Sequence, residues 1–226
     1  MLYKKSKAVR LDESLFLNPT SEYRGTPFWA WNTKLDRDTL LEQIEIFKEM
    51  GFGGFHMHVR TGLETPYLSD EFMEYIKLCS EKAIEEEMLC WLYDEDRYPS
   101  GAAGGLVTKN LRYRARHLLL SKKDYPDFEP NKEQFDRRIE AGEKPIGYYL
   151  ASYCIVLTNG YLGSYRRIKR CEQVDVGDVW HAYVRLSPED PWYNDQTYVD
   201  VLNKEAIEEF IRVTHERYYE VLGSEF

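Results

Sequence analysis

Three consecutive acidic residues, Asp94, Glu95 and Asp96, stand where an apolar, strand-like segment ends. Adjacent carboxylates repel one another, so a fold that keeps them together does so against that repulsion. Carboxyl groups that a fold holds together in this way can have a chemical role, such as the transfer of protons. An acidic triplet also occurs in solvated loops that have no chemical role. The position at a strand end keeps both interpretations open.

A second polar cluster follows from the alternation of side chains along the strand predicted at 53–60. Its apolar residues share one face, which suits packing against helices, and the other face carries His56, His58 and Arg60. Two histidines at this spacing can bind a metal, as in metal-dependent hydrolases, or can join a hydrogen-bonded network with the arginine. No third ligand is visible, which favours the network. We therefore expect no cofactor, with a divalent cation such as calcium as the alternative.

Aromatic and acidic side chains on two further strands complete the set of possible ligand contacts. Trp29 and Trp31 share one face of their strand, where they either fill a core or form a platform for a sugar ring. Asp200 would point inward if Val199 and Val201 face helices. Arg60 has the planar fork that grips a uronate or a vicinal diol.

The elements that must position these residues alternate between strands and helices. Strands are predicted at 26–32, 53–60, 88–96 and 197–203. Helices are predicted at 37–50, after Ser69, from about 101 to 118, and from Asn203 to Gly223. Between the third and fourth strands lies a Tyr-rich block with the hairpin signal Asn159-Gly160, which indicates antiparallel strands.

This order predicts an α/β fold, a partial (β/α)8 TIM-type barrel of about four βα units with an antiparallel β insertion. The expected divisions are an N-terminal extension over 1–25, three βα units over 26–119, the insertion over 120–195, and a fourth βα unit over 196–226. The chain would then end before the barrel closes. The polar residues lie towards the C-terminal ends of the strands, where this class binds its ligands.

Composition excludes several classes of partner. The net charge of −9 argues against nucleic acid, which requires a basic surface. No stretch approaches the roughly 18 apolar residues of a membrane span. The N-terminal segment lacks the apolar region of a secretory signal, so we expect a cytoplasmic location. Free thiols are expected for the four cysteines, with a Cys154–Cys171 bridge left open.

Four stretches of the sequence together resemble one known family. They are PFWAWN (27–32), GGFHMHVRTGLETPYLS (53–69), WLYDEDRYPSGAAGG (91–105), and YVDVLN (198–203) followed by THERYYE (214–220). In order and spacing they resemble the N-terminal part of the catalytic region of α-L-rhamnosidase-like glycoside hydrolases, family 106 and its relatives. The resemblance covers most of 26–118 and 196–226.

The resemblance implies a sugar-binding pocket in a (β/α)8 barrel. It implies that the acidic triplet lines the pocket alongside Trp31, His58, Arg60 and Tyr98, with at most one or two of Asp94, Glu95 and Asp96 catalytic. The remaining residues predicted to bind substrate are Trp29, Asn32, His56, Glu64, Tyr93, Asp200 and Asn203. No residue is predicted to be a metal ligand.

The length of the chain departs from this family. Asp94 and Asp96 are two residues apart, about 6–7 Å along a strand, and cannot face each other across a glycosidic bond. A second carboxylate is expected on a later strand, so we expect a catalytic-domain fragment that binds carbohydrate and is inactive alone. Exposed barrel edges would favour homo-oligomers. The alternatives are a non-catalytic carbohydrate-binding module, or a metal-dependent hydrolase using His56 and His58.

Overall fold

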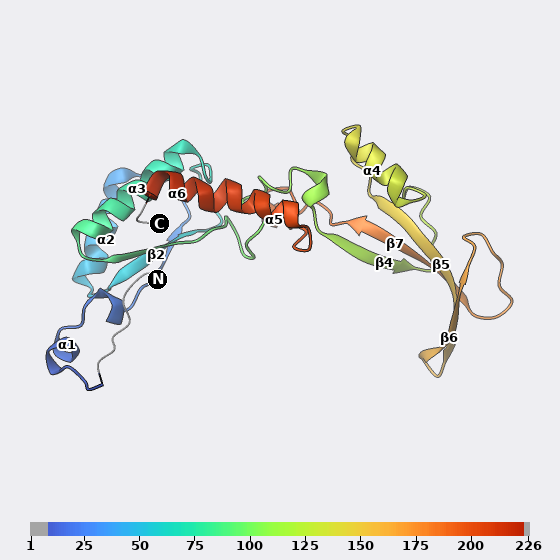
Figure 1. The fold of residues 1–226 in the computed structure, drawn as a ribbon, viewed down its shortest axis with the longest axis horizontal. Coiled ribbons are helices and arrows are strands. Elements are labelled where there is room, and N and C mark those ends of the chain that lie inside the picture. The colour runs from blue at the N-terminus through green and yellow to red at the C-terminus, as the bar shows by residue number, and fades with distance from the viewer. Residues whose placement is uncertain (1–8, 224–226) are drawn as a thin grey trace. The chain divides into compact units, whose positions relative to one another are not determined.

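The computed structural model describes residues 9–223, which fall into two compact units (Figure 1). Among these residues, the first unit comprises 9–104 and 210–223, and the second unit comprises Gly105–Glu209. The first part of the predicted N-terminal extension, residues 1–8, lies outside the described residues. The rest of that extension contains the short helix α1 (Glu13–Leu17) and a 3₁₀ turn at Ser21–Tyr23.

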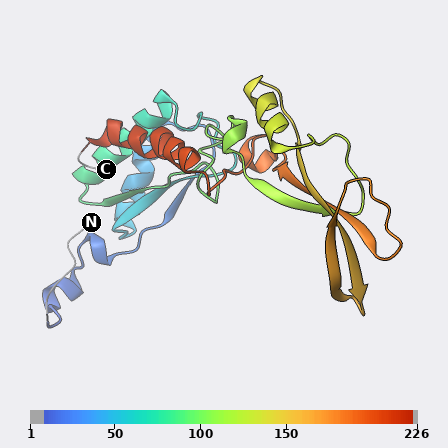
Figure 2. The ribbon, with the colours of Figure 1, turned by 45° about the vertical axis from the view of Figure 1, so that its right-hand side comes forward.

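The first unit is built on a parallel sheet of three strands in the order β1-β2-β3. The strands are β1 (Phe28–Trp31), β2 (Gly54–Val59) and β3 (Leu89–Leu92). Helix α2 (Arg37–Glu49) connects the first two and packs on β2, and α3 (Asp70–Glu85) connects the next two and packs on β3. Figures 1 and 2 show both helices on the same side of the sheet.

Local signals explain why these two helices begin where the sequence predicts. The Asp36 carboxylate accepts a hydrogen bond from the Thr39 N–H at 3.0 Å, and the Ser69 hydroxyl accepts one from the Phe72 N–H at 3.2 Å. Each side chain satisfies a backbone donor that has no partner within its helix. Gly51 ends the first helical segment with a φ of 84°. The predictions of these helices are confirmed.

The helix predicted from about 101 to 118 is not formed. The segment instead forms turns, a 3₁₀ turn at Leu111–Tyr113, and the strand β4 (Arg116–Ser121). Gly101, Ala103 and Gly104 have φ values of 137°, 51° and 61°, which a right-handed helix excludes. The small residues of this segment permit such a backbone, and their sequence pattern does not distinguish it from a helix.

The second unit contains an antiparallel sheet of four strands in the order β4-β7-β5-β6. Its other strands are β5 (Gly147–Thr158), β6 (Tyr161–Ile168) and β7 (Asp178–Leu186). Helix α4 (Lys132–Glu140) covers part of one face, where Phe135 packs against Tyr148 and Leu186. The predicted hairpin turn is confirmed at Asn159 and Gly160, with φ values of 53° and 83°.

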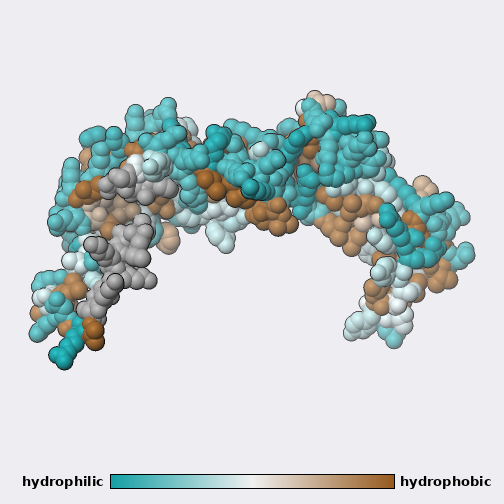
Figure 3. All heavy atoms as spheres, in the orientation of Figure 1, coloured by the Kyte–Doolittle hydropathy of each residue, from teal (hydrophilic) through white to brown (hydrophobic). Residues whose placement is uncertain are grey.

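Exposed apolar side chains occur in both units, and brown areas in Figure 3 mark such residues on the visible face. In the second unit, Leu157 and Leu162 are exposed near the turn of the β5–β6 hairpin. All four cysteines are free thiols, and Cys154 Sγ donates to the Val176 carbonyl at 3.1 Å. The Cys154–Cys171 bridge that the sequence left open is therefore not formed.

The fourth strand predicted at 197–203 is absent. Val199 makes a single antiparallel bridge with Arg114, and Val201 and Leu202 lie in a turn. Leu202 is 93% exposed, so the apolar residues that suggested a buried strand are not all buried. The described residues thus hold three parallel strands, and a partial TIM-type barrel of about four βα units is not confirmed.

The C-terminal helical segment begins after Asn203, as predicted. Asn203 Oδ1 accepts a hydrogen bond from the Glu205 N–H at 3.1 Å, ahead of α5 (Lys204–Ile211). The segment continues as a π-helical turn at Arg212–Glu216 and ends as α6 (Arg217–Leu222). Gly223 follows with a φ of 59°. The π-helical turn was not predicted.

Candidate functional site

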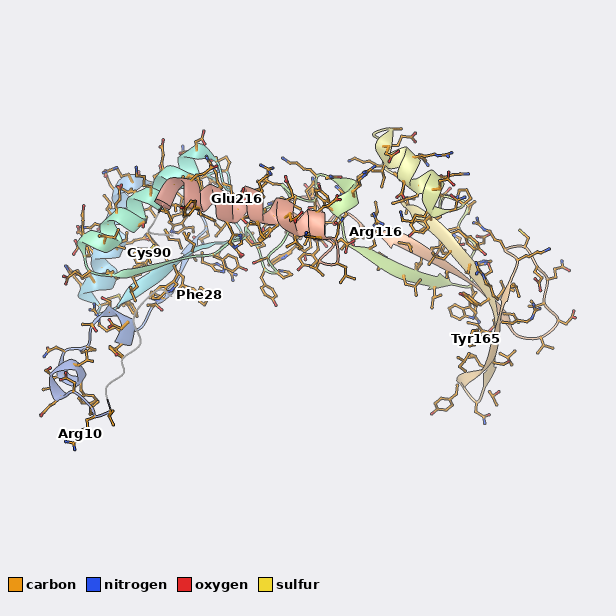
Figure 4. All side chains as sticks on the ribbon, in the orientation of Figure 1. Arg10, Phe28, Cys90, Arg116, Tyr165 and Glu216 are labelled. Atoms are coloured by element: carbon orange, nitrogen blue, oxygen red, sulfur yellow. The ribbon has the colours of Figure 1, made fainter. Side chains whose placement is uncertain are left out.

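The polar face of the first unit's sheet carries aromatic and imidazole rings from all three strands. In register, Phe28 pairs with His56, and His56 pairs with Trp91. The His56 and Trp91 rings stack with centroids 4.9 Å apart, and the His58 and Tyr93 centroids are 4.0 Å apart. We call these five residues the aromatic face. Phe28, labelled in Figure 4, is 72% exposed on the side of the sheet away from α2 and α3.

Trp29 and Trp31 lie on the opposite side of β1, in the core under the helices. The Trp29 Nε1 donates to Gln43 Oε1 of α2 at 2.6 Å, and the Trp31 ring contacts that of Phe72 edge to face at 5.6 Å. Both side chains are buried. The prediction that they form a sugar-stacking platform is corrected, because the side of β1 that carries them is the side covered by helices.

Glu95 is the buried member of the acidic triplet, with 1% of its surface exposed. Its carboxylate accepts four backbone hydrogen bonds, from the N–H groups of Asp96, Gly101, Ala103 and Gly104 at 2.8, 2.9, 2.7 and 2.6 Å. Burial raises the pKa of Glu95, and these hydrogen bonds oppose the rise. The left-handed residues of the turn direct the N–H groups inward, as in an anion-binding nest. Glu95 therefore organises the turn rather than facing a ligand.

Asp94 is the partly exposed member, at the C-terminal end of β3. Ser100 Oγ donates to Asp94 Oδ1 at 2.6 Å, and His215 Nε2 lies 3.5 Å from Asp94 Oδ2. Burial raises the pKa of Tyr67 and of Tyr218, and the charge of Asp94 adds to both shifts. Two protonated phenols therefore lie near this carboxyl group.

Asp96 is buried beside the turn, with Oδ2 at 3.7 Å from the Nε of Arg97. Of the three acids, Asp94 alone combines partial exposure with a carboxyl group oriented by neighbouring side chains. The three neighbouring acids therefore differ in their surroundings. One acid holds the turn, one is buried beside it, and one is available to a ligand.

Several predicted contacts lie on the rim formed by the loops after β1 and β2. The Arg60 N–H donates to the Trp31 carbonyl at 3.0 Å, which continues the pairing of the two strands. The side chains on this rim are exposed, and they belong to Asn32, Arg60, Glu64 and, in the turn after β3, Tyr98. Burial lowers the pKa of His58, and the positive charge of Arg60 lowers it further. His58 is therefore held towards its neutral form.

Asp200 and Asn203 belong to the second unit and make local hydrogen bonds there. Asp200 Oδ1 accepts from the Leu202 N–H at 3.1 Å, and Asn203 Nδ2 donates to the Arg112 carbonyl at 3.1 Å. The expectation that Asp200 points inward from a parallel strand is corrected, because that strand is absent. Their hydrogen bonds shape the turn before α5.

His215 is the residue that sequence reasoning missed. It lies in the π-helical turn at Arg212–Glu216, whose last residue, Glu216, is labelled in Figure 4. A π-helical turn widens the helix by one residue and is frequent at functional sites. The side chain of His215 faces Asp94. The sequence signal was the string at 214–220, which carried a resemblance but no role for this histidine.

Within residues 9–223, no group of three or more His, Cys, Asp or Glu side chains comes together as a metal site. His56 and His58 contact aromatic rings instead of a common centre. No helix in the described part of the chain has the length and apolar character to cross a membrane.

Comparison with protein-family models finds no match, and comparison with curated proteins finds none. Among solved structures, the chain is similar to the rhamnosidase from Novosphingobium sp. PP1Y, with 13% identity and a TM-score of 0.40. The similarity covers 77% of this chain and 26% of that enzyme, so the chain spans about a quarter of its length. A likeness of this size assigns neither an activity nor a substrate.

Proposed function

We propose that this chain is a carbohydrate-active protein whose first unit binds a sugar at the C-terminal ends of β1, β2 and β3. The single observation that carries the proposal is the setting of Asp94. Its carboxyl group is partly exposed at a strand end, oriented by Ser100, and faced by His215. A carboxylate, an imidazole and a hydroxyl held together in this way bind and protonate oxygen atoms, which are what a sugar presents.

The surroundings of Asp94 match the mixed chemistry of a sugar. Arg60 and Tyr93 offer donors for hydroxyl groups, and the exposed ring of Phe28 offers an apolar surface for the C–H face of a pyranose. The resemblance of the sequence to α-L-rhamnosidase-like glycoside hydrolases favours a deoxyhexose such as L-rhamnose. The proposed role is that of a glycoside hydrolase catalytic-domain fragment.

Hydrolysis needs a second carboxyl group, about 5–10 Å from the first. Glu95 is ruled out for this role because its carboxylate is taken up by four backbone N–H groups. In this proposal the chain alone binds sugar without turnover, and the partner carboxylate comes from outside the acidic triplet.

Binding of monosaccharides to the chain, followed by NMR amide shifts, tests the proposal. Methyl α-L-rhamnoside, D-glucuronate and D-glucose serve as probes, and we expect shifts at His58, Tyr93 and Asp94. Asp94→Asn removes a charged acceptor and is expected to weaken binding about tenfold. Glu42→Gln, an exposed carboxylate on α2, is the matched control and is expected to change nothing. Absence of shifts at the strand ends with every probe overturns the proposal.

A second candidate, a non-catalytic carbohydrate-binding module, is favoured by the sequestration of Glu95, which leaves the triplet with one available acid. Assays of the native polypeptide, isolated from its source cells, distinguish the two candidates. Turnover of an aryl α-L-rhamnoside that Asp94→Asn abolishes supports the hydrolase. Sugar binding with no turnover in that native polypeptide supports the module.

A further inference from the structure

The tautomer of His215 follows from its hydrogen bonds. The Thr214 hydroxyl donates its hydrogen to the Phe210 carbonyl at 2.6 Å. A hydroxyl has one hydrogen, so its oxygen can then only accept. His215 Nδ1 lies 3.0 Å from that oxygen. Nδ1 is therefore the donor in this bond and carries a hydrogen.

The opposite nitrogen then meets an acceptor. In a neutral ring with hydrogen on Nδ1, Nε2 has only a lone pair. This lone pair faces Asp94 Oδ2 at 3.5 Å, and an ionised carboxylate is also acceptor-only. Two acceptors at this separation repel. One added proton, on Nε2 or on Oδ2, turns the repulsion into a charge-assisted or neutral hydrogen bond.

We propose that Asp94 and His215 share one exchangeable proton in the folded protein, and that this pair is the proton donor of the sugar site. Ser100 holds the other carboxyl oxygen at 2.6 Å, which keeps Oδ2 directed at the imidazole. The side chains of Asp94 and His215 are 35% and 41% exposed, so the proton is accessible to a ligand. The role in the sugar site rests on the proposed function, whereas the shared proton does not.

Other ionisable groups face Asp94 from neighbouring elements. They are Tyr93 beside it, Tyr67 from the segment before α3, and Tyr218 from α6. The neighbouring Glu95 carboxylate is instead directed at the backbone N–H groups of the turn. Burial raises the pKa of all three tyrosines, and the charge of Asp94 raises each further. The phenols therefore stay neutral and do not compete as bases for the shared proton.

The charged neighbours of His215 on its own helical segment are Arg212 and Glu216, and both are exposed to solvent. Water and salt screen their influence on the ring. The Phe210 ring contacts the imidazole edge to face, with centroids 5.7 Å apart. On the opposite side of the ring, Asp94 Oδ2 lies 3.5 Å from Nε2.

In the proposed hydrolysis the shared proton has a defined destination. It passes to the glycosidic oxygen as the bond from that oxygen to the anomeric carbon breaks, and the electrons of that bond remain on the oxygen. A water molecule supplies the hydroxyl group that ends on the anomeric carbon, and the proton that it releases restores the pair. General acid catalysis of this kind requires a group that is protonated when the ligand binds.

Nitrogen NMR shifts of the His215 ring test the shared proton without any ligand. At about pH 7, we expect Nδ1 to be protonated in the wild type and in Asp94→Asn. The Nε2 shift is expected to move towards its protonated value in the wild type and to show a lone pair in Asp94→Asn. Thr214→Val removes the hydroxyl oxygen that accepts from Nδ1, so the hydrogen of the neutral ring should no longer be fixed on Nδ1. An unprotonated Nδ1 in the wild type, or the same Nε2 shift in wild type and Asp94→Asn, overturns the inference.

The pH dependence of sugar affinity tests the donor role. With methyl α-L-rhamnoside as probe, wild-type affinity should fall by up to about tenfold per pH unit once the pair has lost its proton. His215→Gln keeps a donor towards Asp94 but has no exchangeable proton, so its affinity should be flat over the same range. An unchanged pH profile in His215→Gln overturns the donor role. If the His215 nitrogen shifts are as expected but no sugar binds at any pH, the shared proton is supported and the proposed function is overturned.

Discussion

The Glu95 carboxylate accepts a hydrogen bond from the Gly104 N–H at 2.6 Å, nine residues along the chain. The same carboxylate accepts from Gly101 and Ala103, so one buried side chain closes the turn that follows β3. Asp94 and Ser100 lie in the segment that this turn closes. The hydrogen bond that Ser100 donates to Asp94 therefore depends on the shape of the turn. The geometry of the proposed site therefore depends on a residue that does not itself face a ligand.

Glu95→Gln should destabilise the first unit by about 2–4 kcal/mol, because an amide nitrogen would face backbone N–H groups that need an acceptor. Hydrogen exchange at the amides of Gly101, Ala103 and Gly104 is the measurement, and all three should exchange faster. Glu42→Gln on the exposed face of α2 is the control and should leave exchange unchanged. Unchanged protection of the three turn amides in Glu95→Gln would contradict this account.

Gly104→Ala tests the backbone of the same turn. Gly104 has a φ of 61°, and a Cβ there would lie 3.0 Å from Cδ1 of Tyr67. We expect a loss of about 1–3 kcal/mol from the left-handed backbone and the close contact together. Gly51→Ala is the matched control, because Gly51 has a φ of 84° with nothing within 4 Å of its Cβ position.

Urea unfolding of the first unit compares the two glycine variants. The difference between them isolates the contact with Tyr67 from the cost of positive φ that both share. Equal losses of stability would mean that the turn adjusts freely around Tyr67, and that the packing of Gly104 does not constrain the site.

The sequence signals that succeeded were local ones. Caps at Asp36 and Ser69 predicted two helices because a side chain satisfies backbone donors a few residues away. Strand alternation placed His56 and His58 on one face because the period of a strand is fixed by its backbone. Both signals need no knowledge of the rest of the chain.

The signals that failed depend on distant contacts. In the turn at 101–104, the buried Glu95 carboxylate accepts the backbone hydrogen bonds that helical carbonyl groups would otherwise accept. Helix propensities do not include this competition. The face of Trp29 and Trp31 depends on which side the helices cover, and alternation alone does not specify it. The π-helical turn that carries His215 adds one residue to a regular period, and this shift is invisible to a pattern of apolar positions.

The second unit should be sensitive to acid through Asp124. Hydrogen bonds from Arg170 and then Tyr183 lower the pKa of Asp124. A carboxyl group with a lowered pKa in the folded state favours folding above its ordinary pKa of about 4, and this contribution is lost as the pH falls through the lower folded value. Asp124→Asn should therefore lower the melting temperature at about pH 7 by a few degrees and make little difference at about pH 2.

Thermal unfolding followed by amide signals of β5 and β7 measures this effect, with Asp127→Asn, an exposed acid nearby in sequence, as control. The curves of Asp124→Asn and the wild type should converge as the pH falls. A difference that persists unchanged at low pH would assign the effect to packing of the side chain and not to its charge.

Phe28 is the residue through which we expect the first unit to self-associate. It is 72% exposed on the aromatic face, and it lies on β1, an edge strand of the parallel sheet. An exposed apolar ring on an edge strand favours contact with a second copy. Phe28→Ser should weaken dimerisation about tenfold, since it removes one buried aromatic side chain from each copy.

Sedimentation velocity over a range of protein concentrations measures this association. Phe16→Ser is the matched control, because Phe16 is 68% exposed on α1 and lies outside the sheet. The wild type and Phe16→Ser should show the same concentration dependence, and Phe28→Ser should remain monomeric to higher concentration. If all three proteins sediment as monomers, the edge and the aromatic face do not drive association, and ligand binding becomes the sole proposed use of that face.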